Sequence, residues 1–162
     1  LEYKGEIDIL EETYFNIINL KTASLFAAAT RLGACISNKN KKEKDALESY
    51  GRNIGIAFQI ADDALDYYST KKIFGKEIGK DFFEGKITLP IIFLYQKANP
   101  SEKIFLEKIF KKKNRSNLEL TETQNLIKKY NSIDFCFTRA EYFVNISHNA
   151  LNLTSFSLER SF

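Results

Sequence analysis

Three aspartates lie in one of the most apolar parts of the sequence, where their side chains could bind a metal ion. Asp62, Asp63 and Asp66 follow the largely apolar run at 54–61. Burying an ionised carboxylate without a partner is expensive, so this pattern favours a positive charge opposite the aspartates over a solvated helix face. In a helix, Asp62 and Asp66 share one face, and Gln59 falls on the same side. Such hard oxygen ligands are typical of Mg2+ bound together with substrate phosphates.

The segment after these aspartates is polar and basic and contains closely spaced Gly-Lys pairs. They are Gly75-Lys76, Gly79-Lys80 and, just beyond the segment, Gly85-Lys86. Glycine allows close backbone approach, and lysine supplies a mobile point charge that suits phosphate. Gly-Lys pairs alone are weak evidence, because many loops contain them. Carboxylates followed by such a loop predict a site for a diphosphate bridged by metal ions.

A further lysine lies in an apolar context nearer the start of the chain. Lys21-Thr22 is flanked by Leu20 and Ala23 within an expected long helix. Its side chain could snorkel to solvent along the helix surface. Alternatively, Lys21 points at the same diphosphate from a facing helix. The local sequence leaves both interpretations open.

The elements that must position these residues are helices. Apolar residues recur at helical spacing nearly throughout, and only two prolines and seven glycines interrupt the chain, so the predicted class is all-α. Helices are expected over 13–37, 43–68, 86–98, 102–112, 121–130 and 134–153, with 69–84 as a loop. The stripe expected to pack in the first helix includes Leu25 and Leu32. Cys35 is expected to be a buried free thiol. Phe58 fits a core position as well as the wall of a site.

Composition restricts the class of protein. The chain has 162 residues, is 44% hydrophobic and 28% charged, and carries a formal net charge of +3. These values are typical of one soluble domain with a real core. The absence of a basic stripe with interleaved aromatics argues against nucleic acid, and no apolar stretch is long enough to cross a membrane. Two distant cysteines form no disulfide framework, which favours a cytoplasmic location.

Two strings resemble a known family. The string FQIADDALDY at 58–67, followed by GKEIGKDFFEGKITLP at 75–90, resembles the second aspartate-rich region of trans-polyprenyl diphosphate synthases. Its spacing is similar to that of long-chain members such as octaprenyl diphosphate synthases. Lys21-Thr22-Ala23 resembles the Lys-Thr pair of the same family. The resemblance implies a helical bundle of the isoprenoid synthase type. It also implies a prenyltransferase that elongates an allylic diphosphate with isopentenyl diphosphate, giving a long-chain quinone side-chain precursor.

The resemblance also implies roles for single residues. The implied ligands of Mg2+ are Asp62, Asp63 and Asp66. Those implied to bind the allylic diphosphate are Lys21, Thr22, Gln59, Lys76 and Lys86, with catalytic roles for Lys21, Lys76 and Gln59. Metals and lysines would stabilise the negative charge that develops on the departing diphosphate. A homodimer of the complete protein is expected on the same basis.

One part of the family pattern is absent from the sequence. The first aspartate-rich motif, which binds metal opposite the second, has no counterpart here, and position 1 is Leu. Residues 1–162 are therefore expected to form the C-terminal half of a single all-α synthase domain and to be inactive alone. The alternatives are a non-catalytic partner subunit and the remnant of a split synthase gene.

Overall fold

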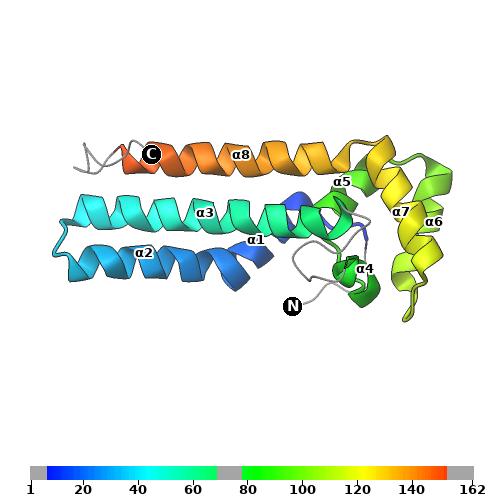
Figure 1. Ribbon diagram of the computed structural model, residues 1–162, viewed down its shortest axis with the longest axis horizontal. Coiled ribbons are helices and arrows are strands. Elements are labelled where there is room, and N and C mark those ends of the chain that lie inside the picture. Colours follow the sequence, from blue (N-terminus) through cyan, green and yellow to red (C-terminus); the bar gives the residue numbers. More distant parts are fainter. Residues whose placement is uncertain (1–6, 69–77, 153–162) are drawn as a thin grey trace. The chain divides into compact units, whose positions relative to one another are not determined.

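The computed structural model describes residues 7–68 and 78–152, which contain helices and no strand. The elements, in chain order, are α1 (Glu11–Ile18), the π-helix η1 (Asn19–Ala23), α2 (Ser24–Ile36), α3 (Lys41–Tyr68), α4 (Lys80–Glu84), α5 (Leu89–Lys97), α6 (Pro100–Lys111), α7 (Asn117–Lys129) and α8 (Ser132–Leu151) (Figure 1). The all-α prediction is confirmed. None of the described helices is long and apolar enough to cross a membrane.

The chain divides into two compact units. Unit 1 comprises Leu1–Tyr14 and Ile60–Thr138, and unit 2 comprises Phe15–Gln59 and Arg139–Phe162. The helices α1, α3 and α8 each begin in one unit and end in the other. Gln59 therefore belongs to unit 2, whereas the three aspartates that follow it on α3 belong to unit 1.

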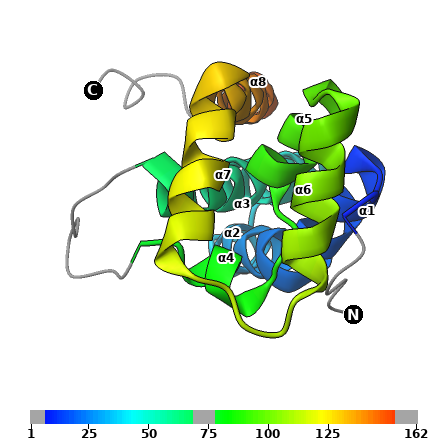
Figure 2. The same cartoon turned by 90° about the vertical axis from the view of Figure 1, so that its right-hand side faces the viewer.

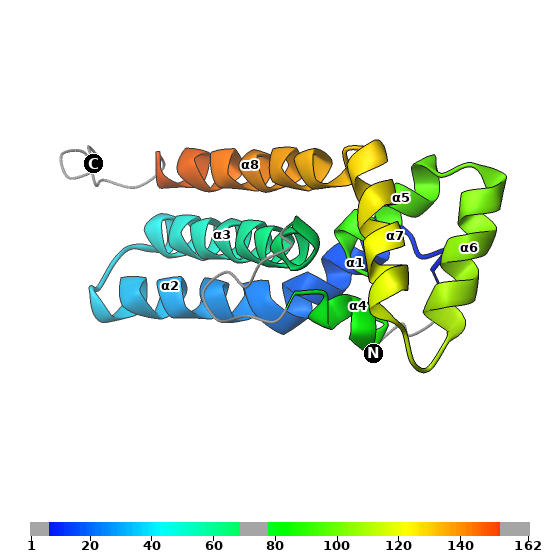
Figure 3. The ribbon, with the colours of Figure 1, turned by 45° about the vertical axis from the view of Figure 1, so that its right-hand side comes forward.

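In unit 2, α2 and the first part of α3 form an antiparallel hairpin, and the end of α8 lies beside α3 (Figures 1 and 3). The polar segment between the helices expected over 13–37 and 43–68 forms a turn at 37–40, and α3 begins at Lys41. Asn38 has a positive φ of 50°, a conformation that asparagine tolerates better than most residues. The amide of Glu43 donates to the Asn40 side chain at 3.0 Å, and the amide of Asn40 donates to the Glu43 carboxylate at 3.3 Å. These reciprocal bonds satisfy amides at the start of α3.

Small residues bring the two helices of this hairpin into close contact. A Cβ atom on Gly51 would lie 2.5 Å from the carbonyl oxygen of Phe26, and one on Gly55 would lie 2.7 Å from the Cα of Ala23. The facing positions Ala23 and Ala27 are buried. The small residues therefore form the side of α2 that contacts α3, and Leu25 and Leu32 lie outside this contact and are exposed.

In unit 1, helices α5, α6 and α7 (Figure 2) each contribute buried residues to the core. Fully buried apolar side chains of this unit include Phe82, Leu89, Ile91, Leu94, Leu106 and Phe110. Helices α6 and α7 are antiparallel, because Lys129 at the end of α7 pairs with Glu102 at the start of α6 and Lys112 pairs with Glu119 at the start of α7. Capping boxes at Asn99 and Ser116 begin α6 and α7, so both helices start a few residues before the positions expected.

Three expectations about single segments are wrong. The segment expected to be a loop at 69–84 contains helix α4, which glycines with positive φ flank at both ends, Gly79 and Gly85. Leu25 and Leu32 are 70% and 60% exposed, because α2 packs on α3 through its alanines. Cys35 is exposed for the same reason, while Cys136 is the buried free thiol.

Candidate functional site

The three aspartates lie in the last two turns of α3, as the sequence predicts. Asp62 is half-buried, whereas Asp63 and Asp66 are only 4% and 3% exposed. Helical spacing places Asp62 and Asp66 on one face of α3, and it places Asp62 and Asp63 three and four residues after Gln59, one turn along the helix. The structure therefore distinguishes the three aspartates by their burial and by their hydrogen-bond partners.

The side chain of Asp63 accepts a buried hydrogen bond from a residue of α1 that lies 49 positions earlier in the sequence. The hydroxyl of Tyr14 donates to its Oδ2 at 2.8 Å. Burial, together with the charge of Asp63 and its hydrogen bond, raises the pKa of Tyr14 well above its usual value. The donated hydrogen bond offsets part of the cost of burying the carboxylate. Asp63 thus fixes the start of α1 in unit 1, a structural role that the sequence did not indicate.

Asp66 anchors helix α4. Its Oδ1 and Oδ2 accept the amides of Lys80 and Asp81 at 3.2 and 2.9 Å, and its carbonyl oxygen accepts the amide of Gly79 at 3.0 Å. These bonds satisfy amides at the start of α4 that have no partner within the helix. A carboxylate oxygen has two acceptor sites, so Asp66 keeps the capacity to bind a cation while it holds α4.

No group of three His, Cys, Asp or Glu side chains in the described part of the chain is arranged to hold a metal ion. The aspartates therefore do not form an all-protein metal cage. Mg2+, however, is usually bound through one or two carboxylates together with substrate phosphates and water. Asp62 and Asp66, four residues apart on one face of α3, fit that requirement.

Lys21 and Thr22 lie in the π-helical segment η1, between two α-helical stretches of one continuous helix. Lys21 is exposed. The hydroxyl of Thr22 donates to Oε1 of Gln59 at 2.7 Å, so the structure brings together two of the residues singled out from the sequence. Single π turns within α-helices occur frequently at functional sites.

The remaining candidates from the sequence are Lys86, Lys76 and Phe58. Lys86 pairs with Asp81 at 2.9 Å and with Glu84 at 2.6 Å. Burial alone would lower the pKa of Lys86, but these two carboxylates raise it above its usual value. Lys76 lies outside the described residues. Phe58 is 57% exposed, and its ring centroid lies 5.7 Å from that of Phe26.

The sequence reasoning missed several residues that hold the candidates in place. Among them is Tyr14, whose partner Asp63 lies 49 positions away in the sequence. Another is Asp81, whose amide donates to Asp66 and whose carboxylate accepts from Lys86. Gly51 and Gly55 did carry a local signal, because two glycines four apart within a helix mark a close approach of another helix. The hydrogen bond from Arg52 to the side chain of Asn19 at 2.9 Å was also missed.

Comparison with known proteins adds to this geometry. A model of the polyprenyl synthetase family matches residues 1–127. The chain is 36% identical over 155 residues to the geranylgeranyl diphosphate synthase of Sulfolobus acidocaldarius, covering 96% of this chain and 47% of the relative. It is 40% identical over 95 residues to the octaprenyl diphosphate synthase of Escherichia coli, covering 59% of this chain and 29% of the relative.

A solved structure shows the same likeness. The polyprenyl synthase of Caulobacter crescentus, complexed with calcium and isoprenyl diphosphate, aligns with a TM-score of 0.89 and 32% identity. The alignment covers 95% of this chain and 47% of that one, which confirms the fold that the sequence predicts. The chain therefore spans about half the length of this structure and of the Sulfolobus relative.

Proposed function

We propose that this chain, which belongs to the polyprenyl synthetase family, forms the half of a prenyltransferase that binds and activates the allylic diphosphate substrate. The observation that carries the proposal is the Thr22–Gln59 hydrogen bond. It holds the segment bearing Lys21 against α3, on the helix face to which Asp62 and Asp66 also belong. By helical spacing that face carries an amide and two carboxylates, and the amide is bonded to the residue that follows Lys21.

The proposed chemistry breaks the allylic C–O bond, and diphosphate departs with the electron pair. The double bond of isopentenyl diphosphate attacks the resulting cation, a C–C bond forms, and loss of a proton restores a double bond. Asp62 and Asp66 would hold Mg2+, which supplies positive charge to the departing diphosphate. Lys21 would contact the same oxygens, and the Gln59 amide, oriented by Thr22, would donate to one of them. Lys76 and Lys86 remain further candidates for the diphosphate.

The Caulobacter crescentus structure, a complex with calcium and isoprenyl diphosphate, supports a divalent cation and a diphosphate substrate for this chain. The relatives are named as makers of geranylgeranyl and octaprenyl products. A long-chain product for this chain stays a prediction from its motif spacing. The cytoplasmic location and the homodimer of a complete synthase also stay predictions.

An exposed apolar face on α2 supports the proposal that this chain works as one half of a fold. Leu25, Leu32 and Ile36 are 70%, 60% and 74% exposed, and the exposed Ala28 and Ala29 lie between them. Their spacing of three to four residues places them on one side of the helix. Exposed apolar faces of this kind usually mark contact surfaces. We propose that the remaining half of the synthase fold covers this face.

The test of the diphosphate site is a binding measurement on the 162-residue chain. Inorganic diphosphate is titrated by calorimetry with and without MgCl2, using wild type, Asp62→Asn and the control Glu122→Gln. Glu122 is an exposed carboxylate on α7, so its variant makes the same charge change elsewhere. We expect Mg2+-dependent binding that Asp62→Asn weakens at least tenfold and Glu122→Gln leaves unchanged. Binding that is insensitive to Asp62→Asn would remove the central assignment.

The alternative is a non-catalytic partner subunit or a remnant of a split synthase gene. The intact mass of the native protein distinguishes it from a complete synthase. A mass equal to that of the 162-residue chain would favour a subunit or remnant. A mass about twice as large would favour a complete synthase.

A further inference from the structure

The π-helical segment η1 contacts one face of α3 at three successive levels. Its first residue, Asn19, accepts a hydrogen bond from Nη1 of Arg52 at 2.9 Å. Its last residue, Ala23, lies against Gly55, where an added Cβ would come within 2.7 Å of the Ala23 Cα. Thr22, the residue before Ala23, donates to Gln59 one turn further along α3. Because 52, 55 and 59 are separated by three and four residues, they share one face of α3.

This segment needs external support to keep its position in the helix. A π turn is rare and is usually confined to one turn inserted in an α-helix. The N-terminal end of η1 has no side-chain cap, and at its C-terminal end the hydroxyl of Ser24 donates to the carbonyl oxygen of Leu20 at 2.9 Å. The residues on both sides, Ile18 and Ser24, keep ordinary α-helical dihedrals. Backbone geometry alone therefore does little to stop the π turn from moving along the helix. Such a move would change the direction in which Lys21 projects relative to Thr22.

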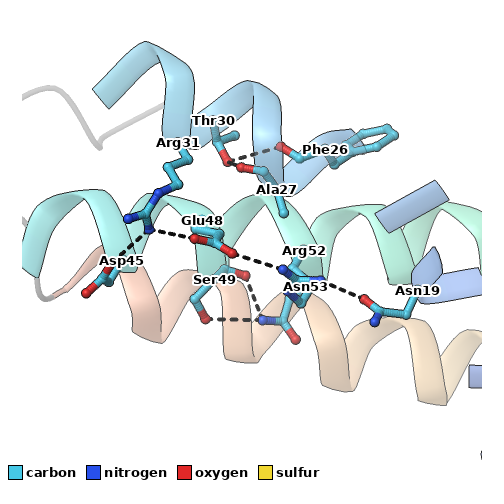
Figure 4. A network of polar contacts seen from close by, with 10 residues as sticks. All are labelled: Asn19, Phe26, Ala27, Thr30, Arg31, Asp45, Glu48, Ser49, Arg52 and Asn53. Carbon is cyan, nitrogen blue, oxygen red and sulfur yellow. Dashed lines mark hydrogen bonds and ion pairs between the residues drawn. The ribbon is translucent and has the colours of Figure 1, made fainter. Parts of the chain in front are cut away.

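Arg52 is itself held in place by a chain of charged side chains within unit 2 (Figure 4). Its Nη2 donates to Glu48 Oε1 at 3.0 Å. The other oxygen of Glu48 accepts from Arg31 at 2.6 Å, and Arg31 also donates to Asp45 at 2.8 Å. The guanidinium of Arg52 thus bonds Glu48 with one nitrogen and Asn19 with another. The planar guanidinium does this with two nitrogens at a fixed separation, whereas a lysine ammonium has a single nitrogen.

We propose that Arg52 is a positioning residue, oriented by Glu48, that fixes the π turn at Asn19–Ala23 and so sets the direction of Lys21. The inference rests on the proposed function only for the consequence that Lys21 binds diphosphate. The position of the π turn is an independent structural claim. Arg52 itself contacts Asn19 and Glu48 in this structure and has no proposed contact with substrate.

The matched control is Arg31. It donates to the same Glu48 carboxylate, and its side chain is 40% exposed against 37% for Arg52, yet both residues to which it donates, Asp45 and Glu48, lie outside η1. Arg52→Gln and Arg31→Gln therefore remove the same charge from the same network. Only the first removes a contact to the π turn. Asn19→Ala removes that contact from the opposite side and leaves both arginines in place.

The first measurement is the set of backbone amide and Cα NMR shifts of the 162-residue chain. We expect Arg52→Gln and Asn19→Ala to change the shifts over residues 19–23, and Arg31→Gln to leave them as in wild type. The second measurement is calorimetric titration with inorganic diphosphate and MgCl2. Here we expect about fivefold or greater weakening for Arg52→Gln and Asn19→Ala, and less than twofold for Arg31→Gln.

The outcomes separate the two proposals. Unchanged shifts at 19–23 in both Arg52→Gln and Asn19→Ala would overturn the positioning role. Equal changes in all three variants would overturn it as well, because the effect would then be general loss of charge or stability. If Arg52→Gln does not fold, Asn19→Ala decides. If wild type does not bind diphosphate at all, the proposed function fails, while the shifts still decide whether Arg52 positions the π turn.

Discussion

The close approach of α2 and α3 makes a sharp prediction for the substitution Gly51→Ala. The added Cβ would lie 2.5 Å from the carbonyl oxygen of Phe26 and 2.2 Å from Oγ1 of Thr30. Forcing an extra carbon into a packed contact costs about 1–3 kcal/mol. Replacing a helical glycine by alanine gains about 1 kcal/mol from helix propensity. The expected net destabilisation is therefore about 0–2 kcal/mol.

Gly33→Ala is the matched control, because Gly33 also lies inside a helix but its added Cβ would meet no heavy atom within 4 Å. This variant should keep the whole gain of about 1 kcal/mol. The difference between the two variants then isolates the steric contact, about 1–3 kcal/mol. One kcal/mol shifts Tm by about 2–4 °C in a chain of this size. Thermal unfolding followed by far-UV circular dichroism should place Gly51→Ala about 2–12 °C below Gly33→Ala, and equal Tm values would refute the close contact.

Three further predictions follow from single contacts. Cys35 should react with a thiol reagent in the native chain and Cys136 only after unfolding, because only Cys35 is exposed; peptide mapping of the labelled protein would show it, and rapid native labelling of Cys136 would contradict its burial. Hydrogen bonds from Lys129, and then from a tyrosine hydroxyl and a backbone amide, lower the pKa of Glu102 from 4.5 to about 2. Its contribution to stability is therefore complete above about pH 4.5 and disappears as the pH falls towards 2; the Tm advantage of wild type over Glu102→Gln should shrink over that range, and a constant difference would argue against the pair. Asp66→Asn leaves one acceptor oxygen where there were two, so the first amides of α4 should exchange with deuterium several-fold faster by mass spectrometry; unchanged protection would show that Asp66 does not hold that helix.

Several features of the fold could be predicted from the sequence because they depend on short-range periodicity. The positions of the long helices follow from apolar residues at helical spacing, and the polar turn at 37–40 follows from the polar composition there. Helix α4 was missed, because Lys80–Glu84 is too short to show a period. Its stability comes from Asp66, a residue outside the helix.

Which side of a helix is buried against its neighbour was harder to predict than where the helix lies in the sequence. Leu25 and Leu32 fit the apolar stripe of an amphipathic helix, yet they are exposed, because Gly51 and Gly55 make the alanine side of α2 the closer fit. The close approach at these glycines thus decides which side of α2 faces α3, and it leaves the leucines on another side. Only the packed structure contains that information.

The same division holds for the candidate site. The sequence by itself determined which chemical groups are available, since residue types and helical spacing alone place Gln59, Asp62 and Asp66 on one face of α3. Tertiary structure decided what those groups contact: the Thr22–Gln59 bond, the Tyr14–Asp63 bond and the anchoring of α4 join residues 14 to 49 positions apart. Helical periodicity is a property of neighbouring residues and can be read locally. A hydrogen bond between distant residues exists only after the chain has packed, so no local pattern specifies it.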